Sequence, residues 1–141
     1  MTQSTAPPHA VQFPLAVKMV MIDTVPDIAA CANRMLRELG RPERPQATVR
    51  TWIGNGVPRL VKRALTGEMW AEPQQQLYDQ ALAVFEKHYA ANVSELSRPF
   101  PGVVEGLKQL QDRGFSLACI TNKAVAFTLP LLRDLGLHGY F

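Results

Sequence analysis

Residues 17–23 read Val17-Lys18-Met19-Val20-Met21-Ile22-Asp23. The run is apolar and β-favouring with almost no polar alternation, which is typical of a strand that is covered on both faces in a parallel sheet. An acidic residue at the carboxyl end of such a strand occupies the place where α/β sheets bind their ligands. The run therefore predicts an α/β protein with Asp23 at the ligand-binding edge of the sheet.

The composition fits one domain. The chain has 141 residues, of which 47% are hydrophobic, enough for one core but too few for two large lobes. It has no apolar run that could cross a bilayer and no signal-peptide pattern at its start, so we expect a cytoplasmic protein without a membrane partner. Residues 1–16 are rich in proline and poor in apolar residues and are expected to form a disordered tail.

Helical signals fill the region after Asp23. Thr24 and Asp27 have the spacing of a capping box, and Gly40 has the position of a left-handed stop. Further apolar residues follow helical spacing over residues 57–66 and 73–93. Residues 24–97 are therefore predicted to be an all-helical block.

The pattern changes after residue 101. It predicts a helix from about residue 102 to residue 113, a buried strand over residues 115–120 and a final helix that ends near Gly136. The strand is followed by a polar cluster, Thr121-Asn122-Lys123. The order of elements predicts a partial Rossmann-like parallel sheet with an inserted all-helical cap.

Four segments carry a resemblance to a known family. They read K-M-V-M-I-D (residues 18–23), T-W-I-G-N-G (51–56), R-P-F-P-G (98–102) and L-A-C-I-T-N-K (117–123). Their order and spacing resemble the haloacid dehalogenase superfamily of phosphatases, and within it the phosphoglycolate phosphatases that carry a helical cap. The resemblance implies a partial core formed by residues 17–23 and 98–141, with residues 24–97 as the cap.

The resemblance also implies a chemistry. Members hydrolyse a phosphate monoester, here 2-phosphoglycolate to glycolate and phosphate, through an aspartyl-phosphate with Mg²⁺ as cofactor. Asp23 would be the catalytic nucleophile and a metal ligand, while Thr121, Asn122 and Lys123 would bind the phosphoryl group. The expected partner is thus a small anionic phosphate ester.

The cap loop has a role by the same resemblance. Gly54, Asn55 and Gly56 correspond to a loop that faces the active site and helps to choose the substrate. Arg59 behind this loop, with Lys62, would hold a substrate carboxylate. From the residues alone, the two glycines are equally typical of a connector that needs positive backbone angles.

The sequence departs from the family pattern in two places. Members carry D-x-D-G-T after the first strand, whereas Asp23 is followed directly by Thr24-Val25-Pro26-Asp27. The general acid two residues after the nucleophile is thus replaced by Val25, which has no proton to donate. The resemblance also implies that a carboxyl-terminal part with further magnesium ligands is missing, so the Mg²⁺ site is incomplete. We expect a truncated chain with impaired or no activity.

Two questions stay open at this point. Asp23 matches either the nucleophile or the acid at the start of the cap hinge, and a helix-capping role explains it equally well. Residues 34–63 contain eight basic and two acidic side chains, so a non-catalytic helical module that binds an anion or a partner is the alternative function, although nucleic acid is not the expected ligand. An unpaired edge beside residues 17–22 would favour self-association.

Overall fold

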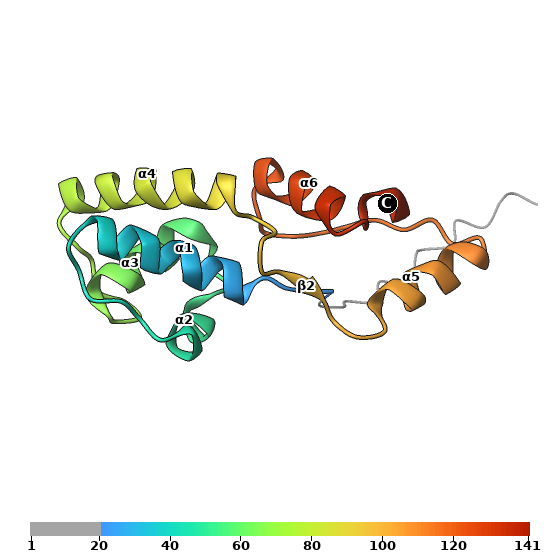
Figure 1. Cartoon of the computed structure of the whole chain (residues 1–141), viewed down its shortest axis with the longest axis horizontal. Coiled ribbons are helices and arrows are strands. Elements are labelled where there is room, and N and C mark those ends of the chain that lie inside the picture. The colour runs from blue at the N-terminus through green and yellow to red at the C-terminus, as the bar shows by residue number, and fades with distance from the viewer. Residues whose placement is uncertain (1–20) are drawn as a thin grey trace, which may run out of the picture.

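The computed structural model describes residues 21–141. The predicted tail (residues 1–16) and the first part of the predicted strand (residues 17–20) lie outside the described residues. Figure 1 shows the helices of residues 25–91 gathered at one end of an elongated molecule and the helices that follow residue 102 toward the other. The elements in order are β1 (Ile22–Asp23), α1 (Val25–Glu38), α2 (Gln46–Trp52), α3 (Gly56–Thr66), α4 (Gln75–Ala91), β2 (Arg98–Pro99), α5 (Val103–Asp112), α6 (Val125–Asp134) and the 3-10 helix η1 (His138–Tyr140).

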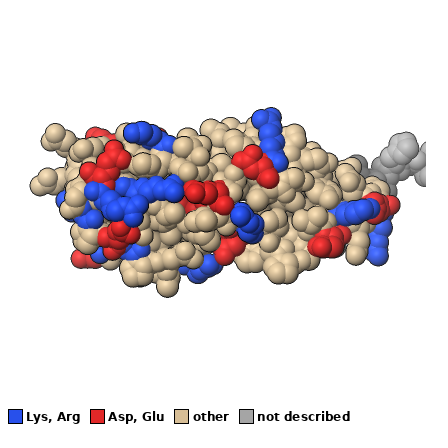
Figure 2. Space-filling view, in the orientation of Figure 1, with Lys and Arg blue, Asp and Glu red and all other residues tan. Residues whose placement is uncertain are grey.

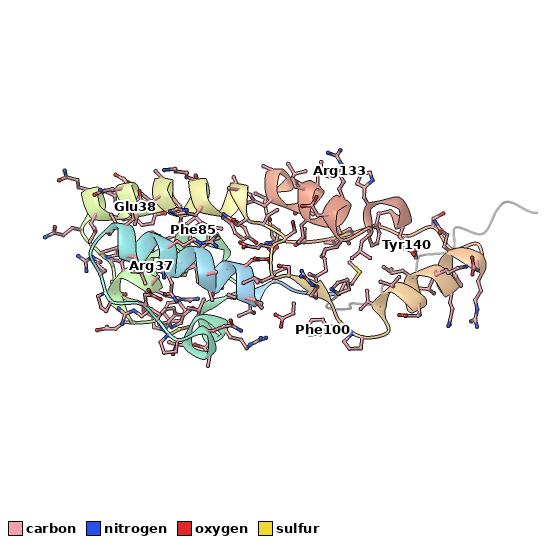
Figure 3. All side chains as sticks on the ribbon, in the orientation of Figure 1. Arg37, Glu38, Phe85, Phe100, Arg133 and Tyr140 are labelled. Carbon is pink, nitrogen blue, oxygen red and sulfur yellow. The ribbon has the colours of Figure 1, made fainter. Side chains whose placement is uncertain are left out.

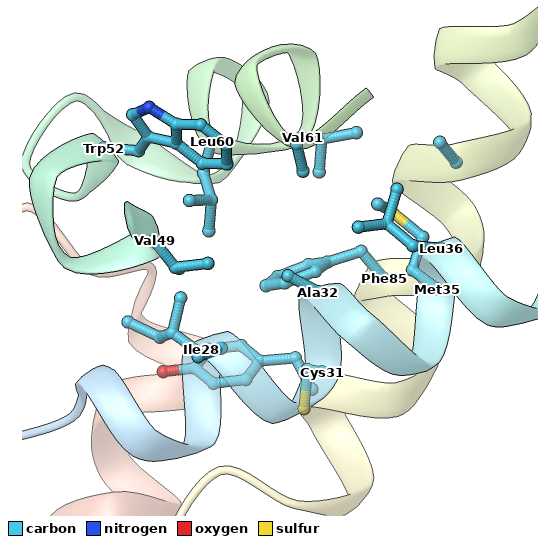
Figure 4. Packing of buried hydrophobic residues seen from close by; sticks show 14 of the residues in the cluster. Ile28, Cys31, Ala32, Met35, Leu36, Val49, Trp52, Leu60, Val61 and Phe85 are labelled. Atoms are coloured by element: carbon cyan, nitrogen blue, oxygen red, sulfur yellow. The ribbon is translucent and has the colours of Figure 1, made fainter. Parts of the chain in front are cut away.

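Helices α1 to α4 share one apolar core. Phe85 from α4 is completely buried and points toward α1 (Figure 3), and α1 contributes the stripe that its periodicity predicts. Figure 4 shows the packing. The buried members of this core from α1 to α4 are Ile28, Ala29, Cys31, Ala32, Met35, Leu36, Val49, Trp52, Leu60, Val61, Ala64, Leu65, Ala81, Phe85 and Tyr89.

The helices predicted in this block are confirmed to within a few residues. The structure also contains α2, a helix that the sequence does not predict. Pro45 precedes α2 with φ −56°, which suits the start of a helix. Val49 and Trp52, three residues apart, are both buried on the same face. The segment is too short for its periodicity to identify it as a helix from the sequence.

The expected capping box at the start of α1 is wrong. Thr24 makes no side-chain capping bond. The Asp27 carboxylate is buried and accepts hydrogen bonds from the amides of Leu96 (2.8 Å) and Ser97 (2.6 Å) and from the Ser97 hydroxyl (2.5 Å). Asp27 therefore ties the first turn of α1 to the segment that follows α4.

A short antiparallel ribbon joins the helical block to the rest of the chain. Ile22 pairs with Pro99 and Asp23 with Arg98, and the Phe100 amide donates to the Met21 carbonyl at 2.9 Å. β1 and β2 are the two ends of the helical insert, so they run in opposite directions. Within residues 21–141 this antiparallel pair is the whole sheet, and most of the first strand of the expected parallel sheet lies outside the described residues.

The predicted strand over residues 115–120 is also wrong, because this segment is neither helix nor strand. Phe115 is 58% exposed and Ile120 is 95% exposed. An apolar run becomes a strand only when a neighbouring strand satisfies its backbone hydrogen bonds. Within the described residues no strand lies beside it.

Helix α6 connects the helical block to a second, smaller core. Leu131 packs into the core of the block, whereas the next residue, Leu132, packs with Val103 and Leu107 of α5 and with Leu137. The helices expected at both ends of this region are confirmed as α5 and α6. Among residues 21–141, no helix is both long and apolar enough to span a bilayer.

Candidate functional site

The predicted phosphate-binding residues form a turn that leads into α6. The Lys123 amide donates to the Thr121 hydroxyl oxygen at 3.1 Å. The Thr128 hydroxyl lies 3.1 Å from the Lys123 carbonyl and 3.1 Å from the Ala124 carbonyl, which fixes the other side of the turn. The Thr121 hydroxyl keeps its own proton available to a ligand.

This turn opens onto a cavity of about 200 Å³ between the segment around β1 and helix α6. Such a volume holds a small anion with a few waters. Its polar lining comes from Thr24, Thr121, Lys123 and Thr128, and its apolar lining includes Ile22. The structure thus brings Thr121 and Lys123 close to β1, while Asn122 is not among the lining residues; their role in binding phosphate stays a prediction.

Lys123 turns toward the helical block instead of into solvent. Its ammonium group donates to the hydroxyl of Tyr89 on α4 and lies 4.6 Å from the centroid of that ring. Burial lowers the pKa of Lys123 to about 8, and the negative charge of Asp27 partly opposes this shift. Lys123 is therefore a cation that loses its charge more readily than an exposed lysine.

Both carboxylate oxygens of Asp23 have partners. One accepts a hydrogen bond from the Val25 amide at 3.2 Å, and the other lies 3.1 Å from the Arg50 guanidinium. The Val25 amide belongs to the first turn of α1, where amides lack helical acceptors. Ile22 and Thr24 line the cavity, whereas Asp23 between them does not.

The described residues do not fit a magnesium site on their own. Within residues 21–141, no three His, Cys, Asp or Glu side chains are grouped as metal ligands. The Asp23 carboxylate is engaged by a cation, Arg50, and one carboxylate does not complete the oxygen shell that Mg²⁺ requires.

The residues of the cap that are predicted to contact the substrate lie outside the cavity formed by Thr121 and Lys123. Gly54 and Gly56 have φ values of 125° and 80°, so the loop does use their conformational freedom. Arg59 pairs with Glu72 at 2.9 Å, and Lys62 pairs with the same carboxylate at 2.5 Å. Gly54, Asn55, Gly56 and Arg59 line neither of the two main cavities of the described region.

Carboxylates neutralise much of the positive charge of residues 34–63. Figure 2 shows acidic and basic side chains interleaved over the helical block. Arg63 is an exception, because its side chain is buried and donates to the carbonyls of Trp52 (2.6 Å) and Met69 (3.1 Å). Residues 34–63 are thus not one continuous cationic surface. The ion pairs of this segment are Arg34–Glu95, Arg37–Glu43, Arg50–Asp23, Arg59–Glu72 and Lys62–Glu72.

Sequence reasoning missed Tyr89 as a neighbour of the site. In the sequence, Tyr89 is one more member of the apolar stripe of α4, and no pattern links it to Lys123. Asp27 is recognisable in the sequence as a carboxylate on the buried face of a helix. Its partners lie about 70 positions away, and helical periodicity gives no information on them.

Comparison with known proteins places these residues in context. The haloacid dehalogenase-like hydrolase family matches residues 7–141. A phosphoglycolate phosphatase of Thiobacillus denitrificans is 54% identical over 136 residues, covering 92% of this chain and 60% of that protein. One from Nitrosospira multiformis is 48% identical with the same coverage.

A solved crystal structure is similar to this chain in fold as well. The crystal structure of a predicted phosphoglycolate phosphatase from Haemophilus somnus superposes with a TM-score of 0.78 at 30% identity, covering 86% of this chain and 55% of that one. The present chain therefore spans between 55% and 60% of the length of these relatives.

Proposed function

The chain belongs to the haloacid dehalogenase-like hydrolase family, and on that premise we propose that it is the phosphoryl-binding part of a phosphoglycolate phosphatase-like hydrolase. The observation that carries the proposal is the turn from Thr121 to Lys123 on the 200 Å³ cavity beside β1. It presents a free hydroxyl proton and a cation to a small anion, which are the groups that hold phosphoryl oxygens. The ligand is a small phosphate monoester such as 2-phosphoglycolate.

The remaining roles are those that the family resemblance implies. Residues 24–97 would form the cap, and Arg59 would have to leave Glu72 to reach a substrate, because it lines neither cavity here. Asp23, the last residue of β1, lies between two residues of the cavity wall and is the candidate nucleophile. For that role its carboxylate must leave Arg50, and the exposure of this ion pair makes the exchange inexpensive.

Turnover by this chain is expected to be low. Two positions after Asp23 stands Val25, which cannot protonate a leaving oxygen, and general-acid help is worth about 10²- to 10⁴-fold in rate. The side chains of residues 21–141 also do not form a Mg²⁺ site. We therefore expect measurable affinity for phosphate compounds and little hydrolysis of them.

A turnover assay tests this directly. Phosphate release from 2-phosphoglycolate with added Mg²⁺ is expected to be close to background, and Asp23→Asn should leave it unchanged. Turnover by the unaltered chain that Asp23→Asn abolishes would contradict the low activity and establish Asp23 as the nucleophile.

Replacing Thr121 by valine tests the binding site. The variant removes a hydroxyl that donates to a charged oxygen, so the dissociation constant of inorganic phosphate should rise by about tenfold or more. Isothermal titration calorimetry measures the constant. Thr51→Val is the matched control, since the exposed Thr51 hydroxyl bonds only the Thr48 carbonyl on α2. Equal affinities for both variants would overturn the assignment of Thr121.

The alternative, a non-catalytic module whose basic helical block binds an anion or a partner, has less support. Its cations are largely paired with carboxylates or, in the case of Arg63, buried. Self-association through an unpaired edge beside residues 17–22 stays a prediction, because most of that run lies outside the described residues.

A further inference from the structure

The Tyr89 ring is fixed by its own packing. Its side chain is 1% exposed, and the ring lies between Phe85 at 5.4 Å and Phe127 at 5.0 Å, measured between centroids. α4 and α6 thus both hold the ring, independently of any polar contact. A buried phenol hydroxyl needs a hydrogen-bond partner, and the partner in the described structure is Lys123, 34 positions along the chain.

Lys123 receives two interactions from this ring that favour its charged form. The hydroxyl oxygen accepts a hydrogen bond from the ammonium group, and the π face lies 4.6 Å from the ammonium nitrogen. The other titratable groups that act on the pair come from α1. They are Asp27, whose charge acts on both Lys123 and Tyr89, and Cys31, which acts on Tyr89 and whose pKa burial raises to about 11, so that the thiol is neutral.

The same lysine belongs to the cavity wall. Lys123 lines the 200 Å³ cavity together with Thr121, and both residues also line the neighbouring, wider cavity beside α6. A lysine side chain has four rotatable bonds and considerable freedom. A fixed acceptor at its end removes that freedom before an anion arrives.

We propose that Tyr89 is a positioning residue for Lys123: it holds the lysine side chain at the wall of the cavity that Thr121 also lines, so that anion binding at this turn depends on α4 being packed against α6. The inference rests on the proposed function, because that function places the phosphoryl group at the turn. By reciprocity, an anion bound there favours the packed arrangement of the two helices. The cap thus contributes to phosphate affinity without contacting the phosphate.

The variant Tyr89→Phe isolates the hydroxyl, since the ring, its packing and its π face remain. The ammonium group loses an acceptor, so the NMR titration of the Lys123 side chain should move to lower pH. The dissociation constant of inorganic phosphate near neutral pH should rise about three- to tenfold. Tyr78→Phe is the matched control: Tyr78 lies on the same helix with Lys62 at 5.1 Å from the centroid of its ring, but neither residue lines either of the two cavities beside α6. It should change neither quantity.

A cycle with Lys123→Met separates positioning from a structural effect. In that background Tyr89→Phe should no longer alter phosphate affinity, and a loss of the original size would overturn the proposal. An unaltered protein that binds phosphate, with Tyr89→Phe matching it in both affinity and titration, would overturn the role of Tyr89 alone. An unaltered protein that does not bind phosphate at all would instead overturn the proposed function, and the inference with it.

Discussion

Replacing Asp27 with alanine is expected to lower the free energy of unfolding by about 3 kcal/mol or more. The carboxylate is 1% exposed and accepts hydrogen bonds from the amides of Leu96 and Ser97 and from the Ser97 hydroxyl. Its removal leaves three donors without a partner in a site with little access to water. Urea denaturation monitored by circular dichroism measures the loss.

The control is Asp79→Ala on α4. Asp79 is exposed and accepts a hydrogen bond from the Gln75 side chain, so its loss should change stability by no more than about 0.5 kcal/mol. If Asp27→Ala were as mild as Asp79→Ala, the bonds between the two ends of the helical block would contribute little to folding.

Replacing Lys123 with methionine is expected to make stability less dependent on pH in alkaline solution. The folded protein lowers the pKa of Lys123 from 10.5 to about 8, mainly through burial. Between these values the unfolded chain binds more protons than the folded one, so the contribution of Lys123 to stability rises with pH. Below pH 8 the buried charge costs the folded state up to about 3 kcal/mol, at about 1.4 kcal/mol per pH unit.

Lys123→Met should therefore be more stable than the unaltered protein near neutral pH, and the difference should shrink toward zero by about pH 10.5. Comparing the two proteins is necessary because Cys31 acts in the opposite direction: its raised pKa of about 11 makes the folded state lose stability as pH rises from 9. Both proteins share Cys31, so the difference cancels it. A difference that stays constant from pH 7 to pH 10.5 would mean that Lys123 is not desolvated.

The sequence predicted the helices well, because they depend on local patterns. The stripe of α1 and the stop at Gly40, which has φ 64°, are readable at 3.6-residue spacing. Thr121 and Lys123 are indicated as phosphate contacts by their position after an apolar run and by family resemblance, and this stays a prediction. These are signals that a few neighbouring residues carry.

The errors concern partners that are distant in sequence. The run at residues 115–120 has strand composition, but composition does not say whether a neighbouring strand is present. Asp27 was assigned to its own helix because its spacing from Thr24 fits a capping box, whereas a site around residues 96 and 97 supplies three donors at once. Three bonds to one carboxylate outweigh a single local cap.

The pair of Tyr89 and Lys123 shows the same limit at the site. In the sequence, Tyr89 is a member of the apolar stripe of α4 and Lys123 is a candidate phosphate contact. The sequence contains no information on their meeting, since it depends on how α4 packs against α6. Tyr89 thus belongs to the buried core and also contacts the charged end of Lys123.

The ribbon of β1 and β2 has a consequence for how such proteins diversify. The chain leaves the scaffold at Asp23 and returns at Arg98, its direct partner in the ladder. Everything between them is topologically the loop of a hairpin, and the entropy of closing a loop grows only slowly with its length. The insert can therefore be lengthened, trimmed or exchanged while the scaffold ends stay where they are, provided that the two-residue ladder and the packing of α4 against α6 are kept.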